Sequence, residues 1–223
     1  MKISILCSNS QHPVLPYLTD WINTRANTHE IELVNEKRML SGGDILFLIS
    51  CHEIIDENIR SYYKNTLVVH ASDLPKGRGW SPHVWQILGG GNEIIISLLE
   101  AEDEVDSGDI WLKKRIIVQK HEIVDEINKK IFETEIELMN FALDNFGGVT
   151  PVKQDNSKAS YYPKRKPMDS KLDPDKTIGE QFDLLRISDP RRYPAYFDYR
   201  GYRYNLNIEK KCKIAVEKGE LDD

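Results

Sequence analysis

Strand-like and helix-like apolar patterns alternate over the first hundred residues of this 223-residue chain. Residues 2–7, 31–34, 44–50 and 66–70 have the period or the continuous apolar character of strands, whereas residues 13–25, 55–64 and 82–88 have a helical period. Strands that alternate with helices are joined by right-handed crossovers into a parallel sheet with helices on its faces. The pattern therefore predicts an α/β fold with a doubly wound, mostly parallel sheet.

The pattern changes after residue 91. Two strand-like segments at 93–99 and 110–118 flank an acidic loop, and a helical period then runs from about 121 to 145. Gly147, Gly148 and Pro151 end that helix, and the next twenty residues are polar and without period. A short helix at 177–187 and a β-hairpin of 196–199 with 202–208 follow. We expect a main domain at 1–150 and a small C-terminal α+β extension at 151–223.

Charge and composition limit the partners that this chain can bind. Its 30 basic and 36 acidic residues give a net charge of -6, which repels a polyanion, so we expect no nucleic-acid partner. We also expect a cytoplasmic protein that does not bind membranes, because no apolar run of about 18 residues and no signal-peptide pattern is present. Cys7, Cys51 and Cys212 lack CxxC spacing, which predicts reduced thiols and neither disulfides nor zinc.

Two titratable residues stand at places where a sheet of this type binds ligands. Ligands bind at the carboxyl ends of parallel strands, which is where Ser8, Ser50, Cys51 and His70 fall. An imidazole there, with the Asp106 carboxylate brought beside it by another strand, is the arrangement of a proton-transfer site. Each residue also has a structural interpretation, because strand-end histidines are often only hydrogen-bonded and Asp-Ser-Gly is ordinary turn chemistry.

Two other segments present hydrogen-bond donors to an anion. One segment offers cationic side chains and backbone amides for a phosphate or carboxylate, or forms a solvated turn. Its residues are Lys76, Gly77, Arg78 and Gly79. Ser8 and Asn9 precede the first helix and either present helix-terminal amides to an anion or cap the helix.

The stretch HASDLPKGRGWSP at 70–82, followed by DSGD at 106–109, resembles the folate-dependent formyltransferases. In that family a catalytic histidine precedes an SxLPxxxGxxP stretch and a catalytic aspartate lies in a DxGxI stretch. The matching positions are His70 and Asp106, at the family's separation. The resemblance covers most of the chain, from about residue 44 through 205. It implies a Rossmann-like formyltransferase core, 10-formyltetrahydrofolate as co-substrate and no metal.

The resemblance also implies where the pterin of the folate would lie. It would rest against the backbone of two segments, whose main-chain amides and carbonyls could read the edge of the ring much as a paired strand would. The residues concerned are Cys51, His52, Glu53, Ile54, Ile55, Ala101, Glu102, Asp103 and Val105. His70 would transfer the proton and polarise the intermediate, and Asp106 would orient the imidazole and take up the amine proton.

One position departs from the family pattern. The family places an asparagine two positions before the histidine, where its amide helps to hold the formyl oxygen, and this chain has Val68 there. Valine cannot donate a hydrogen bond, and losing an oxyanion donor costs about 3 to 4 kcal/mol of transition-state stabilisation if nothing replaces it. Ser72, Asn65 or a backbone amide are the candidate substitutes.

The C-terminal segment looks like that of nucleotide-sugar formyltransferases. The stretches that carry this likeness are YYPKRKP at 161–167, FDLLR at 182–186 and RRYPAYF at 191–197. Methionyl-tRNA enzymes share part of it and continue into a further barrel domain, which we do not expect here. The resemblance thus implies a nucleotide-linked amino sugar as substrate, surface-glycan biosynthesis as the context and a homodimer. Tyr193, Tyr196 and Phe197 would stack on the nucleotide or else pack a small subdomain.

The sequence disfavours two alternatives to formyl transfer and leaves two others open. A dehydrogenase would need a glycine fingerprint between the first strand and helix, and residues 8–11 contain no glycine. The spacing of Asp103, Asp106 and Asp109 matches no calcium loop. A non-catalytic relative that binds folate or a nucleotide sugar stays open because of Val68. Hydrolysis of the formyl donor stays open because water can replace the amine.

Overall fold

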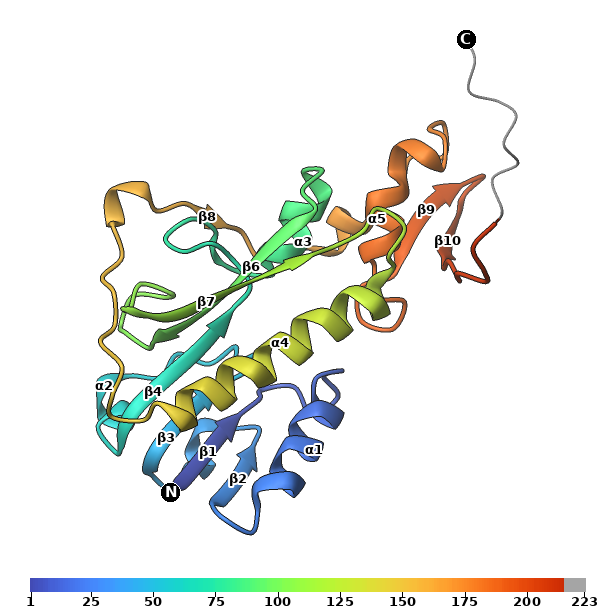
Figure 1. The fold of residues 1–223 in the computed structure, drawn as a ribbon. Coiled ribbons are helices and arrows are strands. Elements are labelled where there is room, and N and C mark those ends of the chain that lie inside the picture. Colours follow the sequence, from blue (N-terminus) through green and yellow to red (C-terminus); the bar gives the residue numbers. More distant parts are fainter. Residues whose placement is uncertain (215–223) are drawn as a thin grey trace.

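A six-stranded sheet forms the centre of the structure, a computed structural model that describes residues 1–214 (Figure 1). In sheet order its strands are β2 (Glu30–Val34), β1 (Lys2–Leu6), β3 (Gly43–Leu48), β4 (Tyr63–His70), β6 (Glu93–Glu100) and β7 (Ile110–Ile117). The first four strands are parallel, whereas β6 is antiparallel to β4 and β7 is antiparallel to β6. The predicted α/β class and mostly parallel sheet are confirmed.

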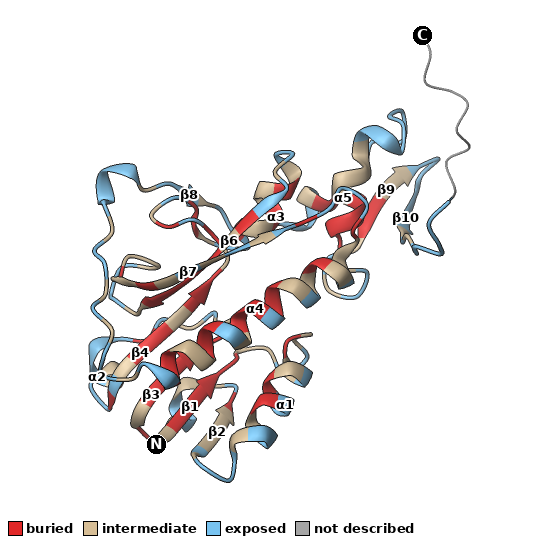
Figure 2. Cartoon of the chain, viewed as in Figure 1, coloured by how far each residue is buried: buried red, intermediate tan, exposed pale blue. Residues whose placement is uncertain are grey.

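Alternate side chains of β1 pack into two separate apolar cores on opposite faces of the sheet. Ile3 and Ile5 of β1 are fully buried in the larger cluster, together with side chains of α1 (Leu15–Arg25) and α4 (Val124–Asp144). Leu6 belongs instead to a smaller cluster on the opposite face. Successive side chains of a strand point to opposite faces, so a strand apolar on both sides needs cover on both. Figure 2 shows the buried strands and the buried side of α4 turned toward the sheet.

The long helix α4 forms because its apolar residues recur at helical spacing. Ile127, Ile131, Leu138 and Ala142 are buried along one stripe. At its start the Glu126 carboxylate accepts a hydrogen bond from the Ile123 amide at 3.0 Å, which satisfies a backbone donor that the helix itself leaves free. Fully burying an Ile or Leu side chain contributes about 1.5–3 kcal/mol, so this stripe anchors α4 on the sheet.

The helix predicted at 55–64 is shorter in the structure. Helix α2 covers only Glu57–Arg60, capped by the Asp56 carboxylate, which accepts from the Ile59 amide at 3.1 Å. Residues from Tyr63 onward instead extend β4, and Gly43 pairs with Tyr63 in register. The Tyr63 hydroxyl donates to Ser4 Oγ at 2.8 Å inside the protein. Sheet pairing has therefore overridden the local helical period.

The predicted irregular segment 153–175 contains a strand that the sequence pattern did not reveal. Strand β8 (Tyr161–Tyr162) pairs in parallel with β5 (Arg78–Gly79), which follows β4 and precedes α3 (Pro82–Leu88). The two strands lie far apart in sequence, so no local period marks their pairing. Short 3₁₀ turns cover Lys37–Met39, Asn156–Lys158, Pro167–Ser170 and Gly179–Gln181.

The C-terminal part forms a small α+β unit at one end of the sheet (Figure 1). It comprises α5 (Phe182–Ile187) and the hairpin of β9 (Ala195–Tyr199) and β10 (Tyr202–Leu206). Arg200 and Gly201 both have positive φ, as a tight hairpin turn requires. The last nine residues of the predicted extension lie outside the described residues. Within residues 1–214 no helix has the length and apolarity needed to cross a membrane.

Candidate active site

A cavity of about 570 Å³ opens where the carboxyl ends of β3 and β4 approach α3 and α4. The loops at 50–55 and 101–106 line one part of it, and α4 and the segment after α5 line another. His70 and Asp106 are both in the wall. The cavity therefore lies at the strand ends where the sheet topology led us to expect a ligand.

His70 and Asp106 meet in this wall although they are distant in sequence. His70 is the last residue of β4 and is 8% exposed, and its Nδ1 lies 3.5 Å from Asp106 Oδ2. Its Nε2 lies 2.9 Å from the carbonyl oxygen of Gly77. A carbonyl oxygen only accepts, so Nε2 carries a hydrogen and Nδ1 faces the carboxylate. A proton placed between Nδ1 and Oδ2 would be shared by the two groups, an arrangement that suits proton transfer at the cavity wall.

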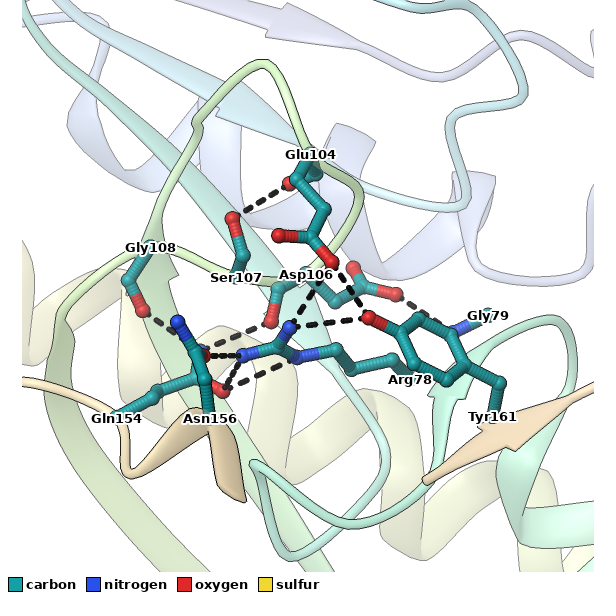
Figure 3. A network of polar contacts seen from close by, with 9 residues as sticks. All are labelled: Arg78, Gly79, Glu104, Asp106, Ser107, Gly108, Gln154, Asn156 and Tyr161. Carbon is teal, nitrogen blue, oxygen red and sulfur yellow. Dashed lines mark hydrogen bonds and ion pairs between the residues drawn. The ribbon is translucent and has the colours of Figure 1, made fainter. Parts of the chain in front are cut away.

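The Asp106 loop is fixed by hydrogen bonds to its main chain and side chain. The Gly79 amide donates to Asp106 Oδ2 at 2.9 Å. Gln154 Nε2 donates to the carbonyl oxygens of Asp106 at 2.8 Å and of Gly108 at 2.7 Å (Figure 3). Asp106 has a φ of 56°, a left-handed conformation that aspartate adopts more readily than most residues. These contacts set the direction in which the carboxylate points.

Arg78 joins this loop to the segment that follows α4. Its guanidinium is almost fully buried and donates to Gln154 Oε1 at 2.8 Å, to Asn156 Oδ1 at 2.6 Å and to the Tyr161 hydroxyl at 3.1 Å. Glu104 lies 3.4 Å from the same guanidinium (Figure 3). A buried guanidinium needs such partners, because an unpaired buried charge costs several kcal/mol. The predicted anion donor is thus bonded within the protein.

All nine residues expected to contact the pterin line the cavity. They are Cys51, His52, Glu53, Ile54, Ile55, Ala101, Glu102, Asp103 and Val105. Burial raises the pKa of the Cys51 thiol, which therefore stays protonated at neutral pH. Val68 also lines the cavity, whereas Asn65 and Ser72 do not. Ser72 Oγ is buried without a hydrogen-bond partner among the described residues.

The residues expected to contact the substrate divide between the cavity and its surroundings. Asn9, Gly79 and Tyr193 line the cavity. Ser8 lies behind the wall, where its Oγ accepts from the His52 amide at 3.0 Å. The expected residues that are not in the wall are Ser8, Ser72, Lys76, Gly77, Arg78, Tyr196 and Phe197.

Tyr196 and Phe197 make contacts of the kind that pack a subdomain. The Arg203 guanidinium carbon lies 4.0 Å from the centroid of the Tyr196 ring. Phe197 stacks on Tyr204 with 5.3 Å between ring centroids, and it packs against the buried cluster of Leu172, Leu185 and Ala195. Of the two roles open from the sequence, packing is the one these contacts describe.

Several cavity residues were missed by the sequence reasoning. They are His12, His83, Asn128, Glu135, Arg165, Asp189 and Arg192. Glu135 had a detectable signal, because it falls in the buried stripe of α4 between Ile131 and Leu138. A carboxylate in an apolar stripe is unusual and points to a special environment. The others carry no local signal, since only the tertiary fold brings them to one wall.

Burial controls the charge of three of these side chains. It raises the pKa of Glu135 to about 8 and lowers the pKa of His12 and of His83 to about 4. The cationic Arg192 lowers the pKa of both histidines further. All three side chains are therefore mainly uncharged at pH 7. Within residues 1–214 no group of three His, Cys, Asp or Glu side chains is placed to hold a metal ion.

Comparison with known proteins agrees with this fold. The formyl transferase family matches residues 6–143 of the chain. A methionyl-tRNA formyltransferase from Ehrlichia canis is 28% identical over 188 residues, which are 83% of this chain and 59% of that protein. The chain thus spans less than two thirds of the length of this curated relative.

Solved structures share the fold at low sequence identity. A methionyl-tRNA formyltransferase from Clostridium thermocellum superposes with a TM-score of 0.81 at 23% identity, over 95% of this chain and 94% of that one. A 4-N formyltransferase from Francisella tularensis superposes with a TM-score of 0.74 at 19% identity, over 95% and 98% of the two chains. The chain belongs to the formyl transferase family, whose members are enzymes that transfer formyl groups.

Proposed function

We propose that this enzyme transfers the formyl group of 10-formyltetrahydrofolate to the primary amine of a nucleotide-linked sugar. The substrate is a UDP- or dTDP-4-amino-4,6-dideoxy sugar used for surface glycans. The observation that carries this proposal is the pairing of His70 with Asp106, 3.5 Å apart, in the wall of a cavity that is also lined by the two proposed folate segments. The choice of an amino sugar rests on the C-terminal resemblance, and the fold is shared with a sugar N-formyltransferase from Shewanella.

The reaction requires an unprotonated amine, a stabilised oxyanion and a proton transfer. The amine nitrogen attacks the formyl carbon, and the carbon–nitrogen bond to the folate breaks as the tetrahedral intermediate collapses. The proton shared by His70 and Asp106 polarises the formyl oxygen or moves to the departing folate nitrogen. Asp106 then takes up the proton that the amine releases, directly or through water. The hydrogen bond from the Gly79 amide to Asp106 Oδ2 keeps the carboxylate turned toward the imidazole.

The folate would be read mainly by main-chain groups. The segments 51–55 and 101–105 line the same part of the cavity, and Val68 lies between them in the wall. Val68 supplies an apolar contact and no donor at the position where the resemblance places an asparagine. The formyl oxygen therefore depends on the His70 imidazole or on a backbone amide.

A second candidate substrate is a methionyl-tRNA. The specific observation in its favour is the name of the relatives, from Ehrlichia canis and Clostridium thermocellum, that match this chain. The net charge of -6 disfavours it, because tRNA binding draws on clustered basic side chains.

The test is to incubate the protein with 10-formyltetrahydrofolate and follow tetrahydrofolate release. The acceptors are dTDP- and UDP-4-amino-4,6-dideoxy sugars and charged initiator tRNA, each compared with a sample without acceptor. We expect release with an amino-sugar nucleotide only. Release with tRNA alone would replace the proposed substrate, release without acceptor would indicate a hydrolase, and no release with any acceptor would indicate a binding protein.

A further inference from the structure

The part of the cavity next to α4 differs in chemistry from the part next to the proposed folate segments. Val124, Asn128 and Glu135 lie on one face of α4 and line the cavity. Asn128 and Glu135 are seven residues apart, which is about two helical turns or roughly 10 Å. His12 joins them, because its ring packs edge-on against Phe132 of α4 with 5.8 Å between centroids. We call this the α4 compartment, defined by Asn9, His12, His83, Asn128, Glu135 and Arg192.

Glu135 is buried in this compartment without a partner. Glu135 is only 7% exposed, and its Oε2 makes no hydrogen bond to any other group of residues 1–214. No ion pair to it is present among those residues. A buried carboxyl without a cation or donors favours its neutral, protonated form, which can donate one hydrogen bond and accept others. The compartment therefore holds an unused donor.

The neighbouring histidines add neutral polar groups. The Val14 amide donates to His12 Nδ1 at 3.2 Å, so the neutral His12 ring carries its hydrogen on Nε2. His83 Nδ1 is buried without a hydrogen-bond partner among the described residues. The cation of Arg192 is balanced by Asp189, whose Oδ2 lies 2.7 Å from Arg192 Nε. The compartment thus offers several uncharged donors and acceptors beside one compensated ion pair.

We propose that the α4 compartment binds the hydroxylated ring of the acceptor sugar, and that Glu135 donates a hydrogen bond to a ring hydroxyl. An uncharged polyol has both donors and acceptors on each hydroxyl, which matches a wall of neutral carboxylic acid, imidazole and amide groups. Binding would satisfy the buried Glu135 oxygen that the protein itself leaves unpaired. The inference rests on the proposed function, because it assumes a sugar acceptor.

The charge of Glu135 makes this binding dependent on pH. Burial raises its pKa to about 8, so the donor is lost above that pH. Four titratable groups near Glu135, namely Cys7, His12, His83 and Asp189, keep their charge between pH 7 and 8.5. The pKa is about 11 for Cys7, held up by burial, and about 4 for His12 and His83. The pKa of Asp189 is lowered by the Arg192 side chain and nearby amides.

The experiment measures binding of dTDP-glucose and UDP-glucose by calorimetry up to pH 8.5, because these probes carry a hydroxyl in place of the amine and the N3–H of their bases stays mainly protonated below that pH. The variants are Glu135→Leu, Glu135→Gln and, as a matched control, Glu133→Leu on the exposed side of the same helix. We expect Glu135→Leu to weaken binding about 10- to 100-fold, because a hydroxyl loses its partner. Glu135→Gln should restore much of the affinity, since its amide also donates.

The pH series separates a hydrogen-bonding role from a structural one. For the wild type, the dissociation constant should rise about fourfold between pH 7 and 8.5, and Glu135→Gln should remove this rise. Equal affinities of wild type and Glu135→Leu for the probes would overturn the inference, as would a rise that persists in Glu135→Gln. A folate analogue bound equally by all variants verifies that the cavity is intact.

The same experiment distinguishes failure of the inference from failure of the proposed function. If the wild type formylates an amino-sugar nucleotide and Glu135→Leu binds the probes as the wild type does, only the role of Glu135 is wrong. If the wild type formylates no sugar nucleotide and binds neither probe, the proposed function is wrong and the inference falls with it.

Discussion

The orientation of His70 and Asp106 depends on main-chain groups that contact their side chains. The Gly77 carbonyl fixes which imidazole nitrogen faces Asp106, and the Gly79 amide fixes which carboxylate oxygen faces the imidazole. This one acceptor and one donor both come from the segment that follows β4, at residues 77–79. The tautomer and direction of the pair are therefore set by main-chain groups that sequence motifs describe only as glycines.

Replacing either member of the pair should slow turnover sharply. His70→Asn and Asp106→Asn each remove the shared proton, and we expect kcat to fall about 10²- to 10⁴-fold, which is the usual contribution of general acid–base catalysis. Steady-state formyl transfer measures kcat, and thermal unfolding verifies that each variant folds cooperatively. A variant that keeps kcat within a few-fold of the wild type would remove that residue from the proposed mechanism.

Glu135 should make the protein less stable as pH rises. Its pKa is raised by burial from 4.5 to about 8, so between these values the folded chain keeps a proton that the unfolded chain has released. Stability from this group is complete below pH 4.5 and is lost as pH rises toward 8. Glu135→Gln cannot ionise, and we expect it to raise the free energy of unfolding by about 3 kcal/mol at pH 7.

Urea unfolding of wild type and Glu135→Gln at pH 5 and pH 7 measures this difference. The gap between the two proteins should be small at pH 5 and large at pH 7. Glu133→Gln is the matched control, because its carboxylate is exposed on the same helix. A gap of the same size at both pH values would show that the effect does not come from ionisation.

At the level of elements, the loop after β6 depends on a partner in the segment that follows α4. Gln154 lies in the irregular segment after α4, and its side chain contacts Asp106, Gly108 and Arg78 together (Figure 3). The strand pair β5 and β8 holds that segment against the loop. The direction of the Asp106 carboxylate is therefore determined jointly by the sheet and by the chain that follows it.

Gln154→Leu should separate activity from folding. The substitution keeps the approximate size of the side chain and removes four hydrogen bonds, leaving buried partners unsatisfied at a cost of about 1–3 kcal/mol. We expect a lower kcat with little change in the KM for the folate, because Asp106 moves and the folate segments do not. Lys153→Leu, an exposed neighbour, is the control. Identical kcat values for the two variants would contradict a positioning role for Gln154.

The elements with a strong local period were predictable from the sequence, and those made by distant pairing were not. The apolar runs of β1, β3 and β4 and the stripe of α4 appear where the sequence placed them. The paired motif of His70 and Asp106 also indicated two side chains that the fold brings together. By contrast, Arg78 and Tyr161 are 83 positions apart, and Arg78 is part of a strand and bonded within the protein, which is neither of the two alternatives that the sequence left open. Hydrogen bonds between segments so far apart have no local pattern.

For the whole molecule, the balance of charge bears on which acceptor it can use. The net charge of -6 predicts no measurable affinity for initiator tRNA at physiological salt, since binding tRNA requires basic side chains that release counterions. Filter binding across a salt series measures this affinity. A dissociation constant that tightens steeply as salt is lowered would instead favour the methionyl-tRNA relatives as a guide to the substrate.

The domain boundary expected near residue 150 stays a prediction, but described contacts cross it. Val152 bridges to Ile110, and the side chains of Gln154, Asn156 and Tyr161 all bond to the buried Arg78. The family match thus ends at residue 143, whereas the hydrogen bonds that hold the Asp106 loop and Arg78 extend to residues beyond 150.

The strand pair β5 and β8 therefore makes the part of the chain that the family model matches depend on the part that follows it. A protein truncated after residue 150 would keep His70, Asp106 and the whole family match. The guanidinium of Arg78 would nevertheless lose its hydrogen-bond acceptors on Gln154 and Asn156. We expect such a truncation to be soluble only as an inactive, loosened form, measurable as lost formyl transfer and fast amide exchange in loop 101–109. Later exchange of the C-terminal segment between relatives would succeed only if it carried these partners with it.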